Sequence, residues 1–275
     1  MQIRIGYELV FECTNSVPMV LMLNVHPSRR DDLVDDDVVV IDPAVQTYTY
    51  RDGFDNICTR FIAPTGRCRI TADALIRDGG FPDIVAPTAR QTCVEQLPDD
   101  TLVYLLGSRY CETDRLSKVA WDLFGNTPTG WPRVQAIVDY VHRHIRFSYA
   151  HARPTKTAFD VFEEQIGVCR DYTHLAIALC RCMNIPARYC TGYVSDVGMP
   201  PPYAPMDFAA WFEAYLDGQW YVFDPRNYVQ RFGRILIARG RDAADVAISN
   251  SFGPSTLTSF KVWTDKIEQD QFEMA

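Results

Sequence analysis

The segment Gly167-Val168-Cys169-Arg170-Asp171-Tyr172-Thr173-His174 brings a cysteine to the start of a predominantly apolar helix. The helix is predicted from near Cys169 to about Met183, and it ends before Pro186, which cannot continue it. Free N–H groups and the positive end of the helix dipole stabilise a thiolate at such a position. The position therefore favours a nucleophile, although a single cysteine is more commonly an inert buried thiol.

A hairpin farther along the chain predicts which residues face each other. Two strands, Ala210 to Tyr215 and Gln219 to Phe223, flank Asp217-Gly218, a strong signal for a two-residue loop. Opposed residues then have numbers that sum to 435, as those of the loop residues do, so Asp224 lies opposite Trp211. Position 209 is the diagonal neighbour of Asp224 on the same face, roughly 7 to 8 Å away. An imidazole there would reach the carboxylate, but the sequence has Ala209.

Three blocks together resemble the motifs of the bacterial transglutaminase-like superfamily, in order and in spacing. The blocks are Gly167 to Asp171, Ala210 to Tyr215, and Trp220-Tyr221-Val222-Phe223-Asp224-Pro225-Arg226. The resemblance implies an α+β fold, in which an N-terminal antiparallel β-domain (residues 1–100, sandwich-like) precedes a papain-like, transglutaminase-like core (residues 101–275). It also implies a Cys-His-Asp triad, with Cys169 as nucleophile and Asp224 as the orienting carboxylate. The family's histidine falls on Ala209.

The implied reaction is attack of the thiolate on a peptide or side-chain amide, giving a thioester. Hydrolysis is favoured over transamidation, since no amine-binding subsite is identified and water is always present. Without the histidine, this chain is expected to be a catalytically impaired form. Ala209 has three candidate explanations: an engineered replacement, which is favoured because the surrounding motif is intact, a natural pseudoenzyme, or a misplaced register. The alternative function is a non-catalytic module that binds a peptide or protein.

Further candidates concern the oxyanion and a substitute base. The N–H of Cys169 is the expected first oxyanion donor, and Gln165, Tyr149 and Trp211 are the other oxyanion or substrate candidates. His174 follows Cys169 by five positions, which rotates it about 140° away on the helix. The positions of His142, His144 and His151 relative to Cys169 cannot be read from the sequence.

The rest of the chain gives a coarse outline. Alternating apolar residues predict a strand over residues 3–11, and shorter strands are predicted at 18–25, 38–41, 46–50 and 56–62. Helices are predicted over Pro132 to Tyr149 and Thr157 to Ile166, and another strand over Ala187 to Val194.

Composition limits the classes of partner. The 275 residues are 47% hydrophobic with a net charge of -8, so a core can form and a nucleic-acid footprint is not expected. No apolar run is long enough to span a membrane. Nine cysteines without framework spacing favour a reduced, cytoplasmic setting, and neither Cys180-Arg181-Cys182 nor the acidic run 31–37 has the spacing of a zinc or calcium site. No cofactor is implied, the expected partner is a peptide or protein substrate, and the oligomeric state stays open.

Overall fold

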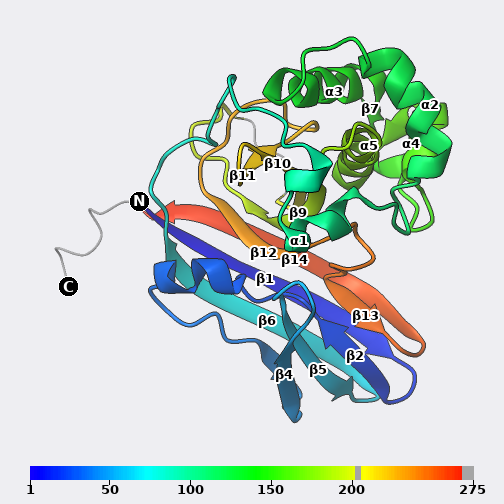
Figure 1. Cartoon of the computed structure of the whole chain (residues 1–275). Coiled ribbons are helices and arrows are strands. Elements are labelled where there is room, and N and C mark those ends of the chain that lie inside the picture. The colour runs from blue at the N-terminus through cyan, green and yellow to red at the C-terminus, as the bar shows by residue number, and fades with distance from the viewer. Residues whose placement is uncertain (202–205, 268–275) are drawn as a thin grey trace.

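A computed structural model describes residues 1–201 and 206–267 of the chain. Two lobes lie one above the other in Figure 1, a lower lobe of strands and an upper lobe in which helices cover a sheet. Strands and helices occupy largely separate stretches of the chain, which confirms the predicted α+β fold class.

The lower lobe consists of two antiparallel four-stranded sheets. One has the order β14-β1-β6-β3 and the other β13-β2-β5-β4. The alternation of apolar side chains along the sequence explains the long strand β1, because Ile3, Ile5, Tyr7 and Leu9 are buried at every second position. The strands are β1 (Gln2–Cys13), β2 (Val17–Leu21), β3 (Val40–Asp42), β4 (Thr47–Arg51), β5 (Ile57–Ala63), β6 (Gly66–Arg77), β13 (Ser249–Ser251) and β14 (Ser255–Ile267).

The division at residue 100 is wrong at its C-terminal side. Strand β14 pairs along the whole length of β1, from Gln2 opposite Ile267 to Cys13 opposite Ser255. The physical reason is that β1 uses only one edge against β6, and its other edge leaves unpaired N–H and C=O groups that a further strand satisfies. The β-domain therefore contains both the beginning of the chain and residues 249–267.

The upper lobe is built around helix α5 (Cys169–Cys182), whose residues 171–182 are all buried. Figure 1 shows α5 between the other helices and the third antiparallel sheet, of order β11-β10-β9-β12. That sheet comprises β9 (Ala187–Val194), β10 (Ala209–Leu216), β11 (Gln219–Phe223) and β12 (Arg234–Gly240). The remaining elements are α1 (Asp99–Leu102), α2 (Thr113–Phe124), α3 (Trp131–His144), α4 (Ala158–Glu164), the short parallel pair β7 (Arg146–Phe147) and β8 (Ile166–Gly167), and the 3-10 turns η1 (Pro27–Asp32), η2 (Val94–Gln96), η3 (Val103–Leu105) and η4 (Tyr149–His151).

Helix α3 is shorter than predicted. It ends at His144, because Ile145 is extended and the next two residues form β7 against β8. Tyr149 is consequently not the end of a helix but the first residue of η4. Strand β6 and helix α2 were not predicted at all, although β6 alternates buried and exposed residues as clearly as β1 does.

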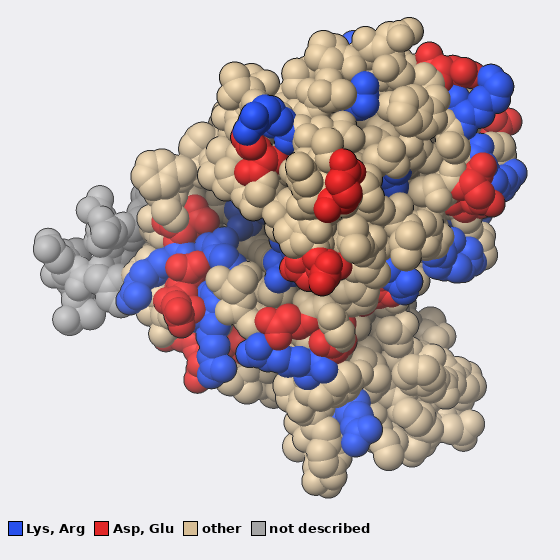
Figure 2. All heavy atoms as spheres, in the orientation of Figure 1, with Lys and Arg blue, Asp and Glu red and all other residues tan. Residues whose placement is uncertain are grey.

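Charged side chains of both signs mix on the face shown in Figure 2, and the lower part of the β-domain shows few of them. At the junction of the lobes Arg29 of η1 pairs with Asp32 at 2.5 Å and with Asp78 at 3.4 Å. Within residues 1–201 and 206–267, no helix is long and apolar enough to cross a membrane.

Candidate active site

The backbone before Cys169 is held so that the cysteine becomes the first residue of α5. Val168 caps the helix in an extended conformation, and its N–H donates to Asp171 Oδ2 at 2.9 Å. A side chain at Gly167 would place its Cβ 2.7 Å from the Asp171 Cβ, so this close turn requires glycine. The buried Lys156 Nζ donates to the Ile166 carbonyl at 2.8 Å and fixes the strand that leads to the turn.

The Cys169 thiol is partly buried beside the start of β10. Burial, followed by the negative charge of Asp207, raises the pKa of the thiol to about 11, and Asp224 contributes in the same direction. The N–H groups of Arg170 and Ala210 oppose this shift by hydrogen bonding to the sulfur. The thiol is therefore protonated near neutral pH, and its surroundings already contain two donors that stabilise a thiolate.

The predicted hairpin register is confirmed. Phe212 pairs with Phe223 and Leu216 with Gln219, so opposed residues have the expected numbering. The two faces of β10 pack against different clusters. Ala210, Phe212 and Ala214 pack into the core that contains α5. Ala209 and Trp211 belong to a separate cluster with Cys190, Val194, Leu236 and Val222.

Ala209 lies on the Trp211 face of β10, because side chains alternate between the two faces of a strand. The thiol lies near the first residues of β10, where the Ala210 N–H lowers its pKa. Trp211, a substrate candidate, is buried at 1% exposure.

Asp224 lies on the Trp211 side of the sheet, but it is already occupied by other partners. Its Oδ1 accepts the Asn227 N–H at 2.9 Å, and its Oδ2 accepts Asn227 Nδ2 at 2.8 Å and Arg234 Nη2 at 3.2 Å. Arg234 also binds Asp83 through Nε at 3.1 Å and Nη2 at 3.0 Å, and its guanidinium lies 4.7 Å from the centre of the Trp211 ring. A buried arginine thus satisfies the carboxylate that would orient an imidazole.

Tyr149 and Asp207 complete the surroundings of the thiol. The Tyr149 hydroxyl donates to Asp207 Oδ2 at 3.5 Å. Burial raises the pKa of the Asp207 carboxyl, while the Phe208 N–H and the Tyr149 hydroxyl oppose that shift. Burial, then the charges of Asp207 and Cys169, raise the pKa of Tyr149. Tyr149 and Asp207 therefore lie beside each other near the thiol, and sequence reasoning missed Asp207.

Gln165 has a different part in the structure. It ends α4 in the left-handed conformation, with φ at 56°, and its carbonyl accepts the Arg146 N–H at 2.9 Å. Its side chain is exposed. The structure thus gives Gln165 a turn role between α4 and β8.

The histidines that could have replaced the missing base have partners elsewhere. His174 points away from the thiol as predicted: its Nε2 accepts the Ala243 N–H at 3.1 Å, and burial holds the pKa of the ring well below its usual value. The other three rings lie against polar groups of their own: His142 Nδ1 is 3.0 Å from the Pro225 carbonyl, His144 Nε2 is 2.8 Å from the Phe162 carbonyl, and His151 Nδ1 is 3.0 Å from Ser148 Oγ.

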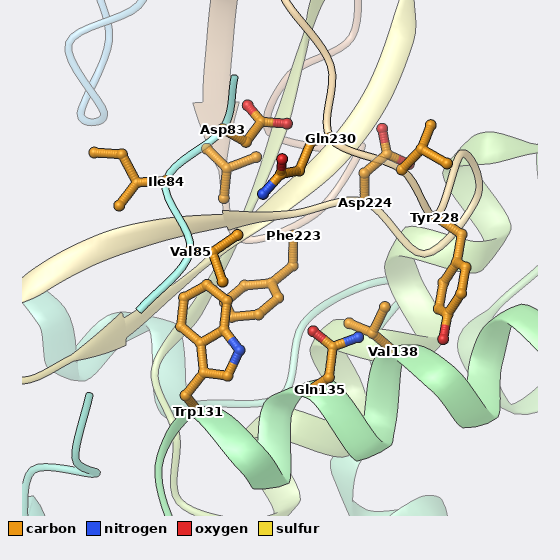
Figure 3. A pocket seen from close by; sticks show the side chains of 12 residues that line it. Asp83, Ile84, Val85, Trp131, Gln135, Val138, Phe223, Asp224, Tyr228 and Gln230 are labelled. Carbon is orange, nitrogen blue, oxygen red and sulfur yellow. The ribbon is translucent and has the colours of Figure 1, made fainter. Parts of the chain in front are cut away.

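A pocket of about 120 Å³ borders Asp224 on the side of α3. Figure 3 shows Trp131, Gln135 and Val138 rising from α3 toward the segment that carries Ile84 and Val85. Most of this lining is apolar, and its polar members are Asp83, Gln135, Asp224, Tyr228 and Gln230. In the part of the chain that the structure describes, no group of three or more His, Cys, Asp or Glu side chains is arranged to hold a metal ion.

Known proteins share both the core and the complete architecture. Residues 118–225 match the model of the transglutaminase-like superfamily. A crystal structure from Cytophaga hutchinsonii, described as a "Putative Cysteine Protease", superposes with a TM-score of 0.84 at 28% identity and covers 98% of this chain and 92% of that one. An uncharacterized protein of Mycobacterium leprae is 25% identical over 74% of this chain and 75% of its own length. One of Mycobacterium tuberculosis is 31% identical over 42% of this chain and 40% of its own length. With the nucleophile helix, the sheet register and the order of the blocks agreeing, residues 118–225 form a core of the transglutaminase-like superfamily.

Proposed function

We propose that this protein carries out thiol-dependent acyl transfer on peptide or side-chain amides, with Cys169 as the nucleophile and hydrolysis as the favoured outcome. One observation carries the proposal: Cys169 is the first residue of the buried helix α5, and the N–H groups of Arg170 and Ala210 lower the pKa of its thiol. A thiolate at that position is favoured by the helix dipole as well as by both donors. The "Putative Cysteine Protease" description of the Cytophaga protein supports the same class of reaction.

The reaction proceeds through a thioester. The sulfur attacks the amide carbonyl, the carbonyl oxygen takes the electron pair, and the amine leaves with a proton. We assign the Cys169 N–H as the first oxyanion donor, since it lies at the start of the helix. The Tyr149 hydroxyl is already engaged by Asp207, so no second donor is assigned. Water then resolves the thioester.

Ala209 makes this chain slow compared with a complete triad. The pairing of Phe212 with Phe223 supports the register that assigns the histidine position to Ala209. An engineered replacement and a natural loss predict the same chemistry, because both leave the thiol without an imidazole. Positioned proton transfer contributes typically 10²–10⁴-fold, which sets the size of the expected deficit.

One observation favours the second function, a module that binds a peptide without cleaving it. Asp224 is satisfied by Arg234 and Asn227, so the orienting carboxylate has partners that a triad would not give it. The pocket beside Asp224 would then belong to the binding surface. In this reading Cys169 forms no thioester.

Acylation by p-nitrophenyl acetate separates the two functions. An enzyme acquires one acetyl group on Cys169, detected by peptide mass spectrometry, and the Cys169→Ala variant acquires none at the corresponding peptide. A thiol that stays unmodified in the parent and in Ala209→His would favour the binding module.

All nine cysteines are free thiols, which supports a reducing, cytoplasmic setting as part of the proposal.

A further inference from the structure

We propose that Arg226 binds a carboxylate of the acyl substrate of Cys169, so that the preferred substrate is an acidic peptide. The inference rests on the proposed function, because the bound carboxylate belongs to the molecule whose amide Cys169 attacks. It adds a binding residue and a chemical class of substrate. Two groups of a peptide have this chemistry, an acidic side chain and the α-carboxylate at the C-terminus, and probes of different structure separate them.

The Arg226 guanidinium is a cation without an acceptor. Within residues 1–201 and 206–267, it makes no hydrogen bond or ion pair. Its Cζ lies 3.9 Å from the centre of the Phe147 ring, and the side chain is partly exposed. A guanidinium that stacks on a ring keeps the N–H groups of its own plane available. This planar fork matches the two oxygens of a carboxylate.

Two other arginines beside the nucleophile and the motif carboxylate already have carboxylate partners. Arg170 Nη2 lies 3.2 Å from Asp171 Oδ1, and Arg234 Nη2 lies 3.2 Å from Asp224 Oδ2. Their donors hold the protein together. Arg226 has no such partner among the described residues, so its donors are available to a ligand.

The backbone that carries this arginine is held on both sides. The Pro225 carbonyl lies 3.0 Å from His142 Nδ1 on α3, and the Asn227 N–H donates to Asp224 Oδ1 at 2.9 Å. The side chain between these two anchors rests on the Phe147 ring. A cation that is positioned before the ligand arrives loses less conformational freedom on binding.

The ring under the guanidinium lies beside the turn of the nucleophile. Phe147 of β7 pairs with Gly167 of β8, and the Ser148 N–H donates to the Gly167 carbonyl at 2.9 Å. Gly167 is two residues before Cys169. Because paired strands lie about 4.8 Å apart and consecutive Cα atoms about 3.8 Å apart, the backbones of Phe147 and Cys169 are within about 12 Å. A carboxylate on Arg226 therefore belongs to a residue only a few positions from the attacked amide.

Tyr149 extends this surface. Its ring is 61% exposed and meets the Phe147 ring edge-on, with the centroids 4.9 Å apart. Its hydroxyl donates to Asp207 Oδ2 at 3.5 Å. Asp207 is the acidic group that opposes a bound carboxylate, but it contacts Tyr149 and, among the described residues, forms no ion pair with Arg226. The surface thus has a cationic end and an aromatic middle, which fit the carboxylate and the apolar part of one peptide.

Alkylation of Cys169 by three iodoacetyl probes tests the subsite without turnover. The neutral probe is N-iodoacetyl-glutamine amide. N-iodoacetyl-glutamine has a free α-carboxylate, and its isomer N-iodoacetyl-glutamic acid α-amide has a free side-chain carboxylate. In each case the sulfur forms a bond to the CH₂ carbon, iodide leaves, and the thiol proton passes to solvent. Peptide mass spectrometry at roughly 0.15 M salt gives the rate at Cys169, divided by the rate at the exposed Cys93 of the same sample.

In the parent, one anionic probe should alkylate Cys169 about tenfold faster than the neutral probe, which corresponds to one charge-assisted contact. The chain has a net charge of -8, so a general attraction of anions does not produce this preference. Preference for the glutamic acid α-amide identifies an acidic side chain as the ligand. Preference for N-iodoacetyl-glutamine identifies the α-carboxylate.

Arg226→Gln should abolish the preference. Arg226→Met retains an apolar stem for the Phe147 ring, and it should give the same loss if Arg226→Gln fails to fold. Arg60→Gln is the matched control and should keep the preference. The Arg60 guanidinium also lies over a ring, 5.3 Å from the centre of Tyr48, but it belongs to β5 of the β-domain.

Three outcomes would overturn the inference. They are equal rates for the three probes in the parent, a preference that persists in a folded variant at position 226, and a preference that Arg60→Gln loses as well. Acetyl-Cys169 formed from p-nitrophenyl acetate in the same preparation would show that the proposed function stands in all three cases. If the parent forms no acetyl-Cys169, the proposed function fails, and the assignment of a substrate carboxylate fails with it.

Discussion

Arg234 Nη2 lies 3.2 Å from Asp224 Oδ2, in a pair whose side chains are only 7% and 4% exposed. The guanidinium also binds Asp83, which belongs to the segment between the β-domain and the core. One buried cation therefore joins the end of β11 to a segment more than a hundred residues away in the chain. Asp224 is a structural link as well as the residue that the family motif places in a triad.

Asp224→Ala should destabilise the protein by about 3 kcal/mol, since removal of one partner leaves a buried arginine with less compensation. Urea unfolding at neutral pH measures this loss. Asp122→Ala is the control, because its pair with Lys118 on α2 is exposed at 63% and 86% and should contribute at most about 0.5 kcal/mol. Similar stabilities for both variants would show that the Arg234 pair is not a structural link.

The coupling between positions 209 and 224 separates the structural role of Asp224 from a catalytic one. In the present chain, Asp224→Ala should change the rate of Cys169 acylation only a few-fold once the folded fraction is accounted for. In an Ala209→His background the same change should cost about 10²–10⁴-fold, because a carboxylate that orients an imidazole acts only through that imidazole. A double-mutant cycle scored by acylation rate measures the coupling. Equal losses in both backgrounds would contradict the carry-over of the triad to Asp224.

Cys169 should be alkylated slowly at neutral pH. With the pKa at about 11, roughly 10⁻⁴ of the thiol is ionised at pH 7, and the rate should rise about tenfold for each pH unit up to the pKa. Iodoacetamide labelling followed by peptide mass spectrometry compares Cys169 with Cys93, an exposed thiol in the same chain. Labelling of both at one rate at pH 7 would mean that burial and Asp207 do not suppress the thiolate.

Glu164 should give the protein a stability that is lost only in strong acid. Hydrogen bonding to Arg153, together with Lys156, lowers the pKa of Glu164 from 4.5 to about 2. Because the folded value is the lower one, this contribution is complete above pH 4.5 and declines as the pH falls through 2. The free energy of unfolding should therefore change less between pH 6 and pH 3 in Glu164→Gln than in the parent. Equal differences would argue against the ion pair.

Replacement of Lys156 should destabilise the protein less than replacement of its partner Glu164. Glu164→Gln leaves the fully buried ammonium with the Ile166 carbonyl but without its carboxylate, at a cost of about 1–3 kcal/mol. Lys156→Met removes that charge and keeps the chain length, while Glu164 retains Arg153 at 2.5 Å. Thermal unfolding of the two variants gives the order, and a larger loss for Lys156→Met would contradict it.

The sequence predicted those parts of the site that depend on local chemistry. The start of α5, strands β9 and β11, and the register of the hairpin follow from turn residues and periodicity that lie close to each element in the sequence. The contact between Asp224 and Asn227 could also have been predicted from the sequence. The Asp224 carboxylate accepts the backbone N–H three positions onward, and aspartate commonly makes such local turns.

The remaining parts of the site arise from contacts between distant segments. Nothing in the pattern near Asp224 indicates that Arg234 reaches it together with Asp83, and no local signal connects Tyr149 with Asp207 across 58 positions. The end of α3 was misplaced for a related reason: apolar periodicity continues through Ile145, but pairing with Ile166 draws the chain into an extended conformation. Propensity gave way to tertiary structure at this point.

The pairing of β1 with β14 has a consequence for the order in which the protein can be assembled during synthesis. Residues 85–248, including the complete thiol site, are synthesised before residues 255–267. One edge of β1 therefore stays unpaired until β14 is made, after every residue of the core, since domains form as their own contacts become available. A chain released early would contain every group of the active site and still lack the strand that closes its other lobe.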